Sequence, residues 1–129
     1  MIIPDLSDKN ASQVVHWTEA TFGTEWVMAS SFSIEDNVLL DLVVAAGIKP
    51  KVFFLDTGRL HEETYAAVDK IRSRYDFDLK IYHPDPQDLT ALLEHDSYTS
   101  IFDSKMQRRA CCRVRKVIPL RKALSEAKA

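Results

Sequence analysis

The sequence of 129 residues predicts an α/β fold with a three-layer, doubly wound parallel sheet. Three short apolar runs suit buried strands. They alternate with longer segments in which apolar residues recur at three- and four-residue spacing, as in helices packed on a sheet. Strands separated by helices of this length form right-handed βαβ units. A chain of this size can bury a real core, and we expect residues 1–129 to form a single domain.

The first half of the chain is expected to hold a helix, a strand and a second helix. The first helix covers residues 8–22 and ends at Gly23. The strand covers residues 26–29, and the second helix follows Ser33 and ends at Gly47. A short loop of small residues therefore joins this strand to its helix.

The next segment repeats the same pattern. A buried strand is expected at residues 52–55, and a helix whose first turn carries Glu62 and Glu63 follows it. A third strand is expected at residues 79–82, and a further helix starts at Pro86. The three strands complete the predicted parallel sheet.

The C-terminal part combines a predicted loop, a helix and a strongly basic segment. Residues 96–110 show weak periodicity and predict a loop over the sheet edge, and the final helix has Pro119 at a kink or a new start. Residues 104–125 include no Asp or Glu, so the other residues carry −10 while the whole chain carries −2. Such a block marks a solvated basic face or a nucleic-acid patch, or it serves a bound anion. Its eight cations are Lys105, Arg108, Arg109, Arg113, Arg115, Lys116, Arg121 and Lys122.

Composition limits the compartment. No run of about 18 apolar residues is present, so we expect no membrane span. The first residues do not combine a basic region with an apolar one, so no secretory signal is expected. With two cysteines, a reducing cytoplasm is the natural compartment.

Serines follow the first strand at its carboxyl end, where open α/β sheets bind ligands. The hydroxyls of Ser30, Ser31 and Ser33, with the free N–H groups of the next helix, could hold an anion. Alternatively, Ser33 merely caps the helix, with Asp36 as its partner in a capping box. The stretch alone supports both interpretations equally.

A second polar loop, DTGR, follows the second strand and falls at the same sheet edge, so both loops should face one crevice. Asp56 could accept hydrogen bonds from a sugar or hold a metal, and Thr57 and Gly58 offer a hydroxyl and a close backbone approach. Arg59 offers a fork for a phosphate or sulfate. The alternative is a turn in which Asp56 and Gly58 serve only backbone geometry.

The adjacent cysteines, Cys111 and Cys112, make a poor chelate for a single zinc ion. Three interpretations remain: two ordinary cysteines, a strained vicinal disulfide, or two ligands of an iron–sulfur cluster whose other ligands lie elsewhere. The residues alone favour ordinary cysteines. The basic surroundings favour the cluster, because cations stabilise an anionic all-thiolate cluster.

Three stretches, SFSIEDNVLL, FLDTGRLHEETY and CCRVRKVIPLRKAL, are similar in order and spacing to the assimilatory adenylyl-sulfate reductases of the phosphoadenylyl-sulfate (PAPS) reductase family. The similarity covers most of residues 25–124. It implies an adenine nucleotide alpha hydrolase-like fold, related to the ATP pyrophosphatases. In its adjacent cysteines the sequence resembles the subgroup of the family that carries a [4Fe-4S] cluster and prefers adenylyl sulfate, rather than the PAPS reductases.

The resemblance implies roles for individual residues. It assigns the modified phosphate loop to Ser31, Ser33 and Asp36, and the other nucleotide-binding loop to Asp56, Thr57, Gly58 and Arg59. It assigns two ligands of the cluster to Cys111 and Cys112. It gives Lys116 the role of linking the cluster's charge to the substrate sulfate.

The resemblance also implies a reaction in assimilatory sulfate reduction and cysteine biosynthesis. A cysteine thiolate attacks the sulfur of adenylyl sulfate, AMP leaves, and thioredoxin reduces the resulting S-sulfonate to release sulfite. Such attack and exchange are ordinary thiolate chemistry. The expected partners are adenylyl sulfate or AMP and thioredoxin, with a homo-oligomer possible.

Complete family members continue beyond this point with a C-x2-C pair and a catalytic cysteine, and this sequence, ending at Ala129, has neither. We therefore expect the nucleotide-binding half alone, without sulfite release or an intact cluster. Two rival functions remain. One is a module of the wider ATP pyrophosphatase and sulfurtransferase group, whose SGGxDS loop differs from the serine loop here. The other is nucleic-acid binding, which the −10 elsewhere disfavours.

Overall fold

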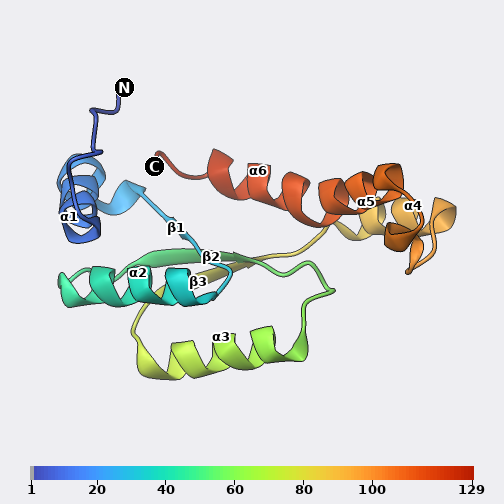
Figure 1. Ribbon diagram of the computed structural model, residues 1–129, viewed down its shortest axis with the longest axis horizontal. Helices are drawn as coiled ribbons and strands as arrows, with labels where there is room; N and C mark the ends of the chain where they lie inside the picture. The colour runs from blue at the N-terminus through green and yellow to red at the C-terminus, as the bar shows by residue number, and fades with distance from the viewer. Residues whose placement is uncertain (1) are drawn as a thin grey trace.

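The computed structural model describes residues 2–129. Its sheet has three parallel strands in the order β1-β2-β3 (Figure 1), which confirms the predicted α/β class. The strands are β1 (Met28–Ala29), β2 (Lys51–Leu55) and β3 (Asp78–Tyr82). β1 is shorter than predicted, because the N–H of Val27 donates to the carbonyl of Ala129 at 2.9 Å instead of to a strand.

Helices connect the strands in the predicted order. Specific caps define several starts: the Asn10 side chain accepts from the N–H of Gln13 in a capping box, and Asp85 caps a helix whose first residue is Pro86. Gly47, with φ of 77°, ends another. The α-helices are α1 (Ala11–Phe22), α2 (Ile34–Ala45), α3 (Glu62–Arg74), α4 (Pro86–His95), α5 (Lys105–Cys112) and α6 (Ile118–Ser125). Short 3-10 turns are η1 (Gly23–Glu25) and η2 (Ser100–Phe102), and η3 (Arg113–Val117) is a π-helix.

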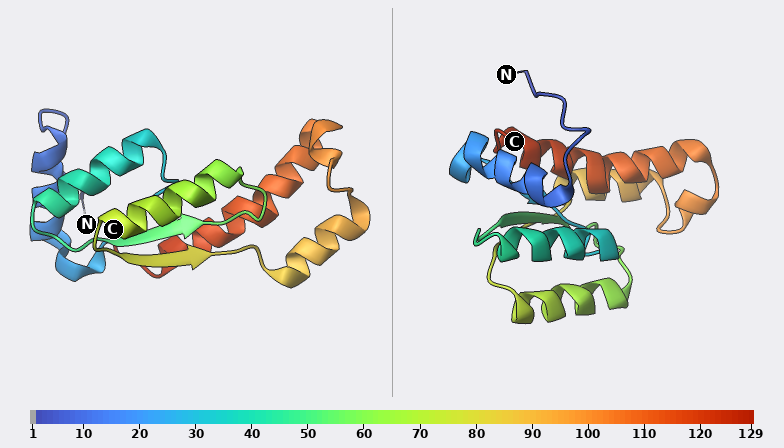
Figure 2. Two further views of the ribbon diagram at one scale, coloured as in Figure 1. Left: turned by 90° about the horizontal axis from the view of Figure 1, so that it is seen from below. Right: turned by 60° about the vertical axis from the view of Figure 1, so that its left-hand side comes forward.

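Helices cover both faces of the sheet, which makes the fold three-layered (Figures 1 and 2). Alternate side chains of β2 point to opposite faces. Val52 and Phe54 join the larger core, against α2 and α3. Phe53 joins a smaller core with Tyr82 and Ala123 of α6.

The prediction of a loop at residues 96–110 holds for residues 96–104, apart from one 3-10 turn, and is wrong for residues 105–110, which are helical. This segment contains η2 and the first residues of α5, and together with α4 it forms an arm that projects beyond the sheet (Figure 2). The Ser104 hydroxyl accepts from the N–H of Gln107 at 3.1 Å and so starts α5. The apolar face of α5 is short and polar residues surround it, which explains the weak periodicity.

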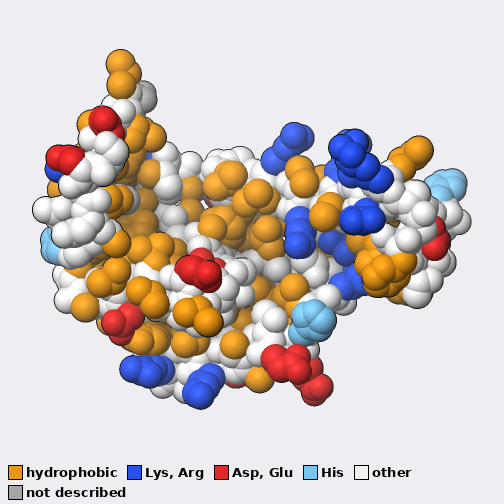
Figure 3. All heavy atoms as spheres, viewed as in Figure 1, with side chains coloured by type: hydrophobic (Ala, Val, Ile, Leu, Met, Phe, Trp, Pro, Cys, Tyr) orange, Lys and Arg blue, Asp and Glu red, His pale blue; other side chains and the backbone are white. Residues whose placement is uncertain are grey.

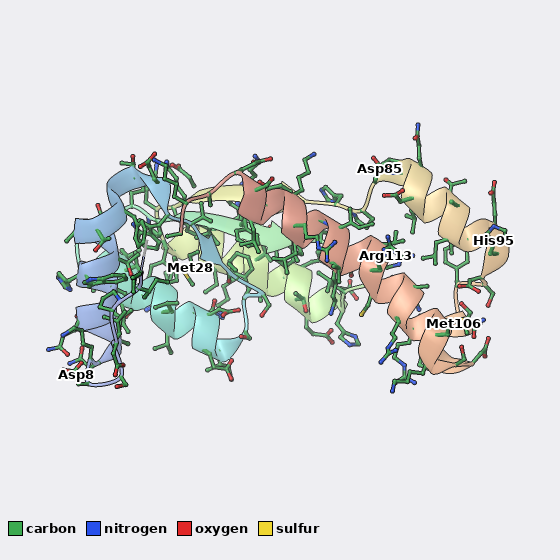
Figure 4. All side chains as sticks on the ribbon, turned by 90° about the horizontal axis from the view of Figure 1, so that it is seen from above. Asp8, Met28, Asp85, His95, Met106 and Arg113 are labelled. Atoms are coloured by element: carbon green, nitrogen blue, oxygen red, sulfur yellow. The ribbon has the colours of Figure 1, made fainter. Side chains whose placement is uncertain are left out.

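The three segments α5, η3 and α6 form one continuous rod. Figure 4 shows Arg113 on this rod, between the sheet and the arm that carries Asp85, His95 and Met106. Pro119 lies in the first turn of α6, as predicted. Among residues 2–129, no helix has the length and apolar character to cross a membrane.

Candidate functional site

Asp36 organises the serine loop between β1 and α2. Its Oδ2 accepts from the N–H and the hydroxyl of Ser31, each at 2.7 Å, and from the hydroxyl of Ser33 at 3.2 Å. Ser33 occupies the N-cap position of α2, but its side chain makes no capping hydrogen bond. The capping-box interpretation of Ser33 and Asp36 is therefore wrong, because the Ser33 hydroxyl donates to the Asp36 carboxylate instead of accepting from an N–H of the helix.

The carboxylate of Asp36 is held in its ionised form. Partial burial raises the pKa of this group, but the hydrogen bonds from Ser31 and Ser33 outweigh that effect, and the pKa lies below its ordinary value. The negative charge of Asp36 therefore holds Ser31 and Ser33 at the N-terminus of α2.

Phe32 gives the loop its shape. Its φ of 58° is in the left-handed region, while its side chain is only 5% exposed and packs edge-on against Phe54, with ring centroids 5.4 Å apart. Its N–H donates to the hydroxyl of Ser30 at 3.0 Å, and its carbonyl accepts from Asn37 at 3.1 Å. Such backbone strain in a non-glycine residue often accompanies function.

The DTGR loop after β2 is folded largely on itself. Asp56 Oδ1 accepts from the N–H of Gly58 at 2.9 Å and from the hydroxyl of Tyr65 at 2.8 Å, and this contact raises the pKa of Tyr65. The N–H of Arg59 donates to the hydroxyl of the buried Thr57 at 3.1 Å. His83 Nδ1 lies 3.7 Å from Asp56 Oδ2. These contacts favour the turn interpretation for Asp56 and Gly58.

Arg115 ties the rod to the DTGR loop. It is 6% exposed, and its Nη1 donates to the carbonyl of Thr57 at 2.7 Å. Among the residues described, its buried Nε has no hydrogen-bond partner and its charge has no carboxylate within ion-pair distance. A buried cation of this kind favours an anion nearby. The other seven cations of the basic segment are exposed, and Lys and Arg side chains gather over α5 and α6 in Figure 3.

The two loops line one cavity of about 710 Å³, as predicted for the crevice at the carboxyl edge. Lys116 lines it from the rod, and α2 and α3 begin at its walls. Of the predicted site residues, the cavity brings together Ser31, Ser33, Asp36, Thr57 and Lys116. The neighbouring Asp56, Gly58 and Arg59 are not among its lining residues, nor are Cys111 and Cys112.

The sequence did not identify three residues of this region: Phe32, Glu63 and Arg115. Glu63 lines the cavity from the first turn of α3. A signal for Phe32 was available, since a bulky apolar residue stands between two serines in a loop. The sequence shows Arg115 as one of the eight cations of residues 104–125, and nothing in the sequence predicts that it is buried.

The cysteines end α5, with Cys111 half-buried and Cys112 exposed, and both are free. A vicinal disulfide is thus not formed. Adjacent helical positions point about 100° apart, so the two thiols face different directions. An all-cysteine [4Fe-4S] cluster takes four thiolates. The ligand type fits but the set is incomplete: residues 2–129 hold no group of three or more His, Cys, Asp or Glu side chains able to bind a metal ion.

Residues 25–129 match the family model described as the phosphoadenosine phosphosulfate reductase domain. The chain belongs to this family. Relatives named adenosine 5'-phosphosulfate reductase include a Pseudomonas aeruginosa (strain LESB58) protein, 34% identical over 125 residues, which are 96% of this chain and 45% of the relative. A Bacillus pumilus (strain SAFR-032) protein of the same name is 36% identical over 118 residues, 91% of this chain and 49% of the relative.

A solved structure has the same fold. The crystal structure of phosphoadenylyl-sulfate reductase from Candida auris, a phosphate complex, superposes with a TM-score of 0.76 at 21% identity and covers 94% of this chain and 58% of that one. This phosphoadenosine phosphosulfate reductase family member therefore has the family's α/β architecture. The chain spans about half the length of the curated relatives described above.

Proposed function

We propose that this chain is the nucleotide-binding half of a thioredoxin-dependent adenylyl-sulfate reductase, acting in cytoplasmic sulfate assimilation and cysteine biosynthesis. The observation that supports it most is that Ser31, Ser33 and Lys116, from two separate segments of the chain, line the same cavity. The N-terminus of α2 and the Lys116 ammonium are usual partners of phosphate and sulfate. The Ser31 and Ser33 hydroxyls donate to Asp36 Oδ2 and would turn from that carboxylate to a bound anion.

The cavity also suits the rest of a nucleotide. Its volume lies in the range of ordinary small-molecule sites. Apolar side chains from the strands and α3 would contact the flat faces of adenine, while the serine loop binds the phosphate. The apolar lining residues include Phe54, Leu55, Leu60 and Ala67.

Lys116 would act on the transferred group. In the proposed reaction a cysteine thiolate, supplied from beyond the residues described, forms a bond to the sulfate sulfur. The bond from sulfur to the bridging oxygen breaks, and AMP leaves with the electron pair. The Lys116 ammonium would offset negative charge on the sulfonate oxygens as this happens. A thioredoxin dithiol would then release sulfite by reducing the S-sulfonate.

Cys111 and Cys112 would supply two of the four thiolates of a [4Fe-4S] cluster, and the rest would come from another segment. A bound cluster would supply electrostatic influence near the substrate. Arg115 contributes from the protein side, because it holds the DTGR loop against the rod that carries both cysteines and Lys116.

Calorimetric titration of anaerobically purified protein with AMP and with adenylyl sulfate tests the proposal, alongside iron and sulfide assays. We expect both nucleotides to bind and Lys116→Ala to weaken adenylyl sulfate more than AMP. Arg121→Ala, an exposed cation of the same rod outside the cavity, is the matched control. Sulfite release with thioredoxin should be absent from the 129-residue chain.

If the exposed cations bind nucleic acid instead, the titrations should give the opposite result. Capture of single-stranded nucleic acid that weakens steeply with salt, without AMP binding, would contradict the proposed function. Competition by AMP for the same site would instead place the anion in the cavity.

A further inference from the structure

The arm presents three large apolar side chains to solvent. Tyr98 is 68% exposed, Phe102 is 78% exposed and Met106 is 79% exposed. They follow one another at four-residue spacing, from the turn after α4 through η2 into the first turn of α5, and Figure 4 shows Met106 near the far end of the arm. Single exposed apolar residues are normal in a monomer, but several large ones on one segment are typical of an interaction surface.

The backbone that carries these side chains is held in place. Ser100 is buried, and its hydroxyl donates to the carbonyl of Ser97 at 2.7 Å. Nε2 of Gln107 donates to Asp96 Oδ1 at 3.3 Å, which ties α5 to the end of α4. The exposed apolar side chains therefore belong to an ordered surface.

The arm also carries charges of both signs. Residues 86–112 include four acidic and three basic side chains, so their net charge is −1. At the end of the molecule that the arm forms, Figure 3 shows hydrophobic, basic and acidic side chains on one face. In the part of the chain that the structure describes, no ion pair involves Asp88, Glu94, Asp103, Lys105, Arg108 or Arg109.

We propose that the arm binds the arm of a second copy of this chain in a dimer with two-fold symmetry. This inference goes beyond the proposed function and does not depend on nucleotide binding. A two-fold axis brings the same patch of both copies together, so the apolar side chains of one arm cover those of the other. The cations of each α5 then lie against the acidic side chains of the opposite arm.

The charge balance of the arm favours a second copy over a partner of one charge. A patch with a single sign of charge would repel its own copy, whereas a patch with both signs complements itself. Residues 113–122 carry five cations and no acidic residue, so a nucleic acid or a strongly acidic protein would bind the rod there rather than the arm. The arm projects beyond the sheet, which leaves its surface accessible to a second molecule (Figure 2).

Sedimentation velocity at increasing protein concentration tests the dimer, and we expect a reversible change from monomer to dimer. Met106→Gln should raise the dissociation constant of the dimer by more than about tenfold, because one buried methionine is lost from each copy. Ile34→Gln is the matched control, since Ile34 is 81% exposed but lies on α2, outside the arm. A chain that stays monomeric at every concentration, or equal effects of the two substitutions, would overturn the proposal.

An exchange of charges tests how the two arms meet. One double variant, Glu94→Lys with Asp103→Lys, reverses acidic side chains, and another, Arg108→Glu with Arg109→Glu, reverses basic ones. Each variant alone should be monomeric because like charges would meet across the axis. An equimolar mixture should form a heterodimer, which would also show that both variants fold.

The mixture gives a second test of the apolar contact. Adding Met106→Gln to both variants should weaken the heterodimer, whereas attraction between opposite charges alone would leave it unchanged. A mixture that stays monomeric, or double variants that each dimerise as well as the unmodified chain, would rule out the two-fold arrangement.

Binding of AMP separates this inference from the proposed function. Met106 does not line the cavity, so Met106→Gln should bind AMP as tightly as the unmodified chain does. If the unmodified chain binds no AMP but dimerises through the arm, the proposed function falls and the dimer stands. If it binds AMP and remains monomeric, only the dimer is overturned.

Discussion

Phe32 combines two requirements that rarely occur together. Its backbone adopts a left-handed conformation, at φ of 58°, while its ring fills the core between Phe54 and Phe77. A glycine would adopt this backbone freely, and a large apolar residue would fill this core, but each alone meets one requirement. The position of both flanking serines depends on this residue.

Replacing Phe32 by alanine and by glycine separates the two effects. Each variant loses the ring, and we expect a loss of about 3–5 kcal/mol in the free energy of unfolding. Phe32→Gly should be about 1 kcal/mol more stable than Phe32→Ala, because alanine keeps the left-handed strain. Urea unfolding measures both. An alanine variant equal to or more stable than the glycine variant would refute the strain.

Asp36 predicts a dependence of stability on pH. Its folded pKa lies below the ordinary value of 3.8, so its contribution is complete above that value. As the pH falls below it, the unfolded state binds a proton first, and the contribution is lost as the pH passes the folded pKa. Asp36→Asn should lower the free energy of unfolding by about 1 kcal/mol at neutral pH. The difference should vanish in acid.

Urea midpoints measured across this acidic range test that dependence. Asp69→Asn serves as the control, since Asp69 is an exposed carboxylate of α3 whose side chain accepts no hydrogen bond in the part of the chain described. A constant difference between Asp36→Asn and the unmodified chain at every pH would rule out the proposed role of the ionised carboxylate.

Sequence patterns identified part of the site at this scale. Ser31, Ser33 and Thr57 could be placed in one crevice because parallel strands end at one sheet edge. Sequence patterns could not predict the left-handed backbone of Phe32 or the burial of Arg115, because both depend on contacts with residues distant in sequence. The capping-box alternative for Asp36 fails for a related reason: local spacing suits a capping box, but the carboxylate turns to Ser31.

At the scale of elements, the DTGR loop lies against the rod. Gly58 has φ of 72°, and a Cβ added there would come within 3.4 Å of the Arg115 guanidinium. Gly47 has a similar φ of 77°, but its added Cβ would meet nothing within 4 Å. The two glycines therefore share a backbone requirement and differ only in their surroundings.

Alanine substitutions at these glycines should have different effects on binding. Each should cost about 1 kcal/mol of stability or somewhat more, because alanine disfavours the left-handed region. Only Gly58→Ala should also weaken AMP binding, since only its added Cβ would touch Arg115 Nη1, the atom that donates to the Thr57 carbonyl. Urea unfolding and calorimetry check the two effects. Equal AMP affinities in both variants would contradict the coupling of loop and rod.

Sequence patterns predicted the regular elements better than the arm. The helices α1 and α2 begin and end close to the expected residues, and α3 and α4 begin where expected, because glycines, a proline and acidic first-turn residues mark these positions. The segment at 105–110 was misread because a short, polar helix such as α5 buries few residues and its periodicity is too brief to recognise.

At the scale of the whole molecule, α6 is held on its face of the sheet partly by polar contacts. The hydroxyl of Tyr82 donates to Glu126 Oε2 at 2.7 Å, and Lys80 bonds the same carboxylate. Lys80, and then Tyr82, lower the pKa of Glu126, so this tether weakens in acid as the carboxylate takes up a proton. The opposite face has a similar contact, from Tyr75 to Asp41 Oδ1 at 2.8 Å.

Two tyrosine variants compare these faces. Tyr82→Phe and Tyr75→Phe each remove one hydroxyl bonded to a carboxylate, and each should lower the free energy of unfolding. Only Tyr82→Phe should speed amide hydrogen exchange in residues 118–129, because only that hydroxyl reaches the segment. Faster exchange of α6 in both variants, or in neither, would argue against a local tether.

The π-helix in the middle of the rod sets the phase between the arm and the sheet. A π-turn holds one residue more than an α-turn, so the helical faces on its two sides are offset. Deleting a single residue from 113–117 would restore an ordinary α-helix and turn everything beyond by about 100°. Either Leu120 and Ala123 would rotate away from the sheet, or, if they stayed packed on it, the arm would project in a different direction. The direction of the arm is thus set by the count of residues in one turn.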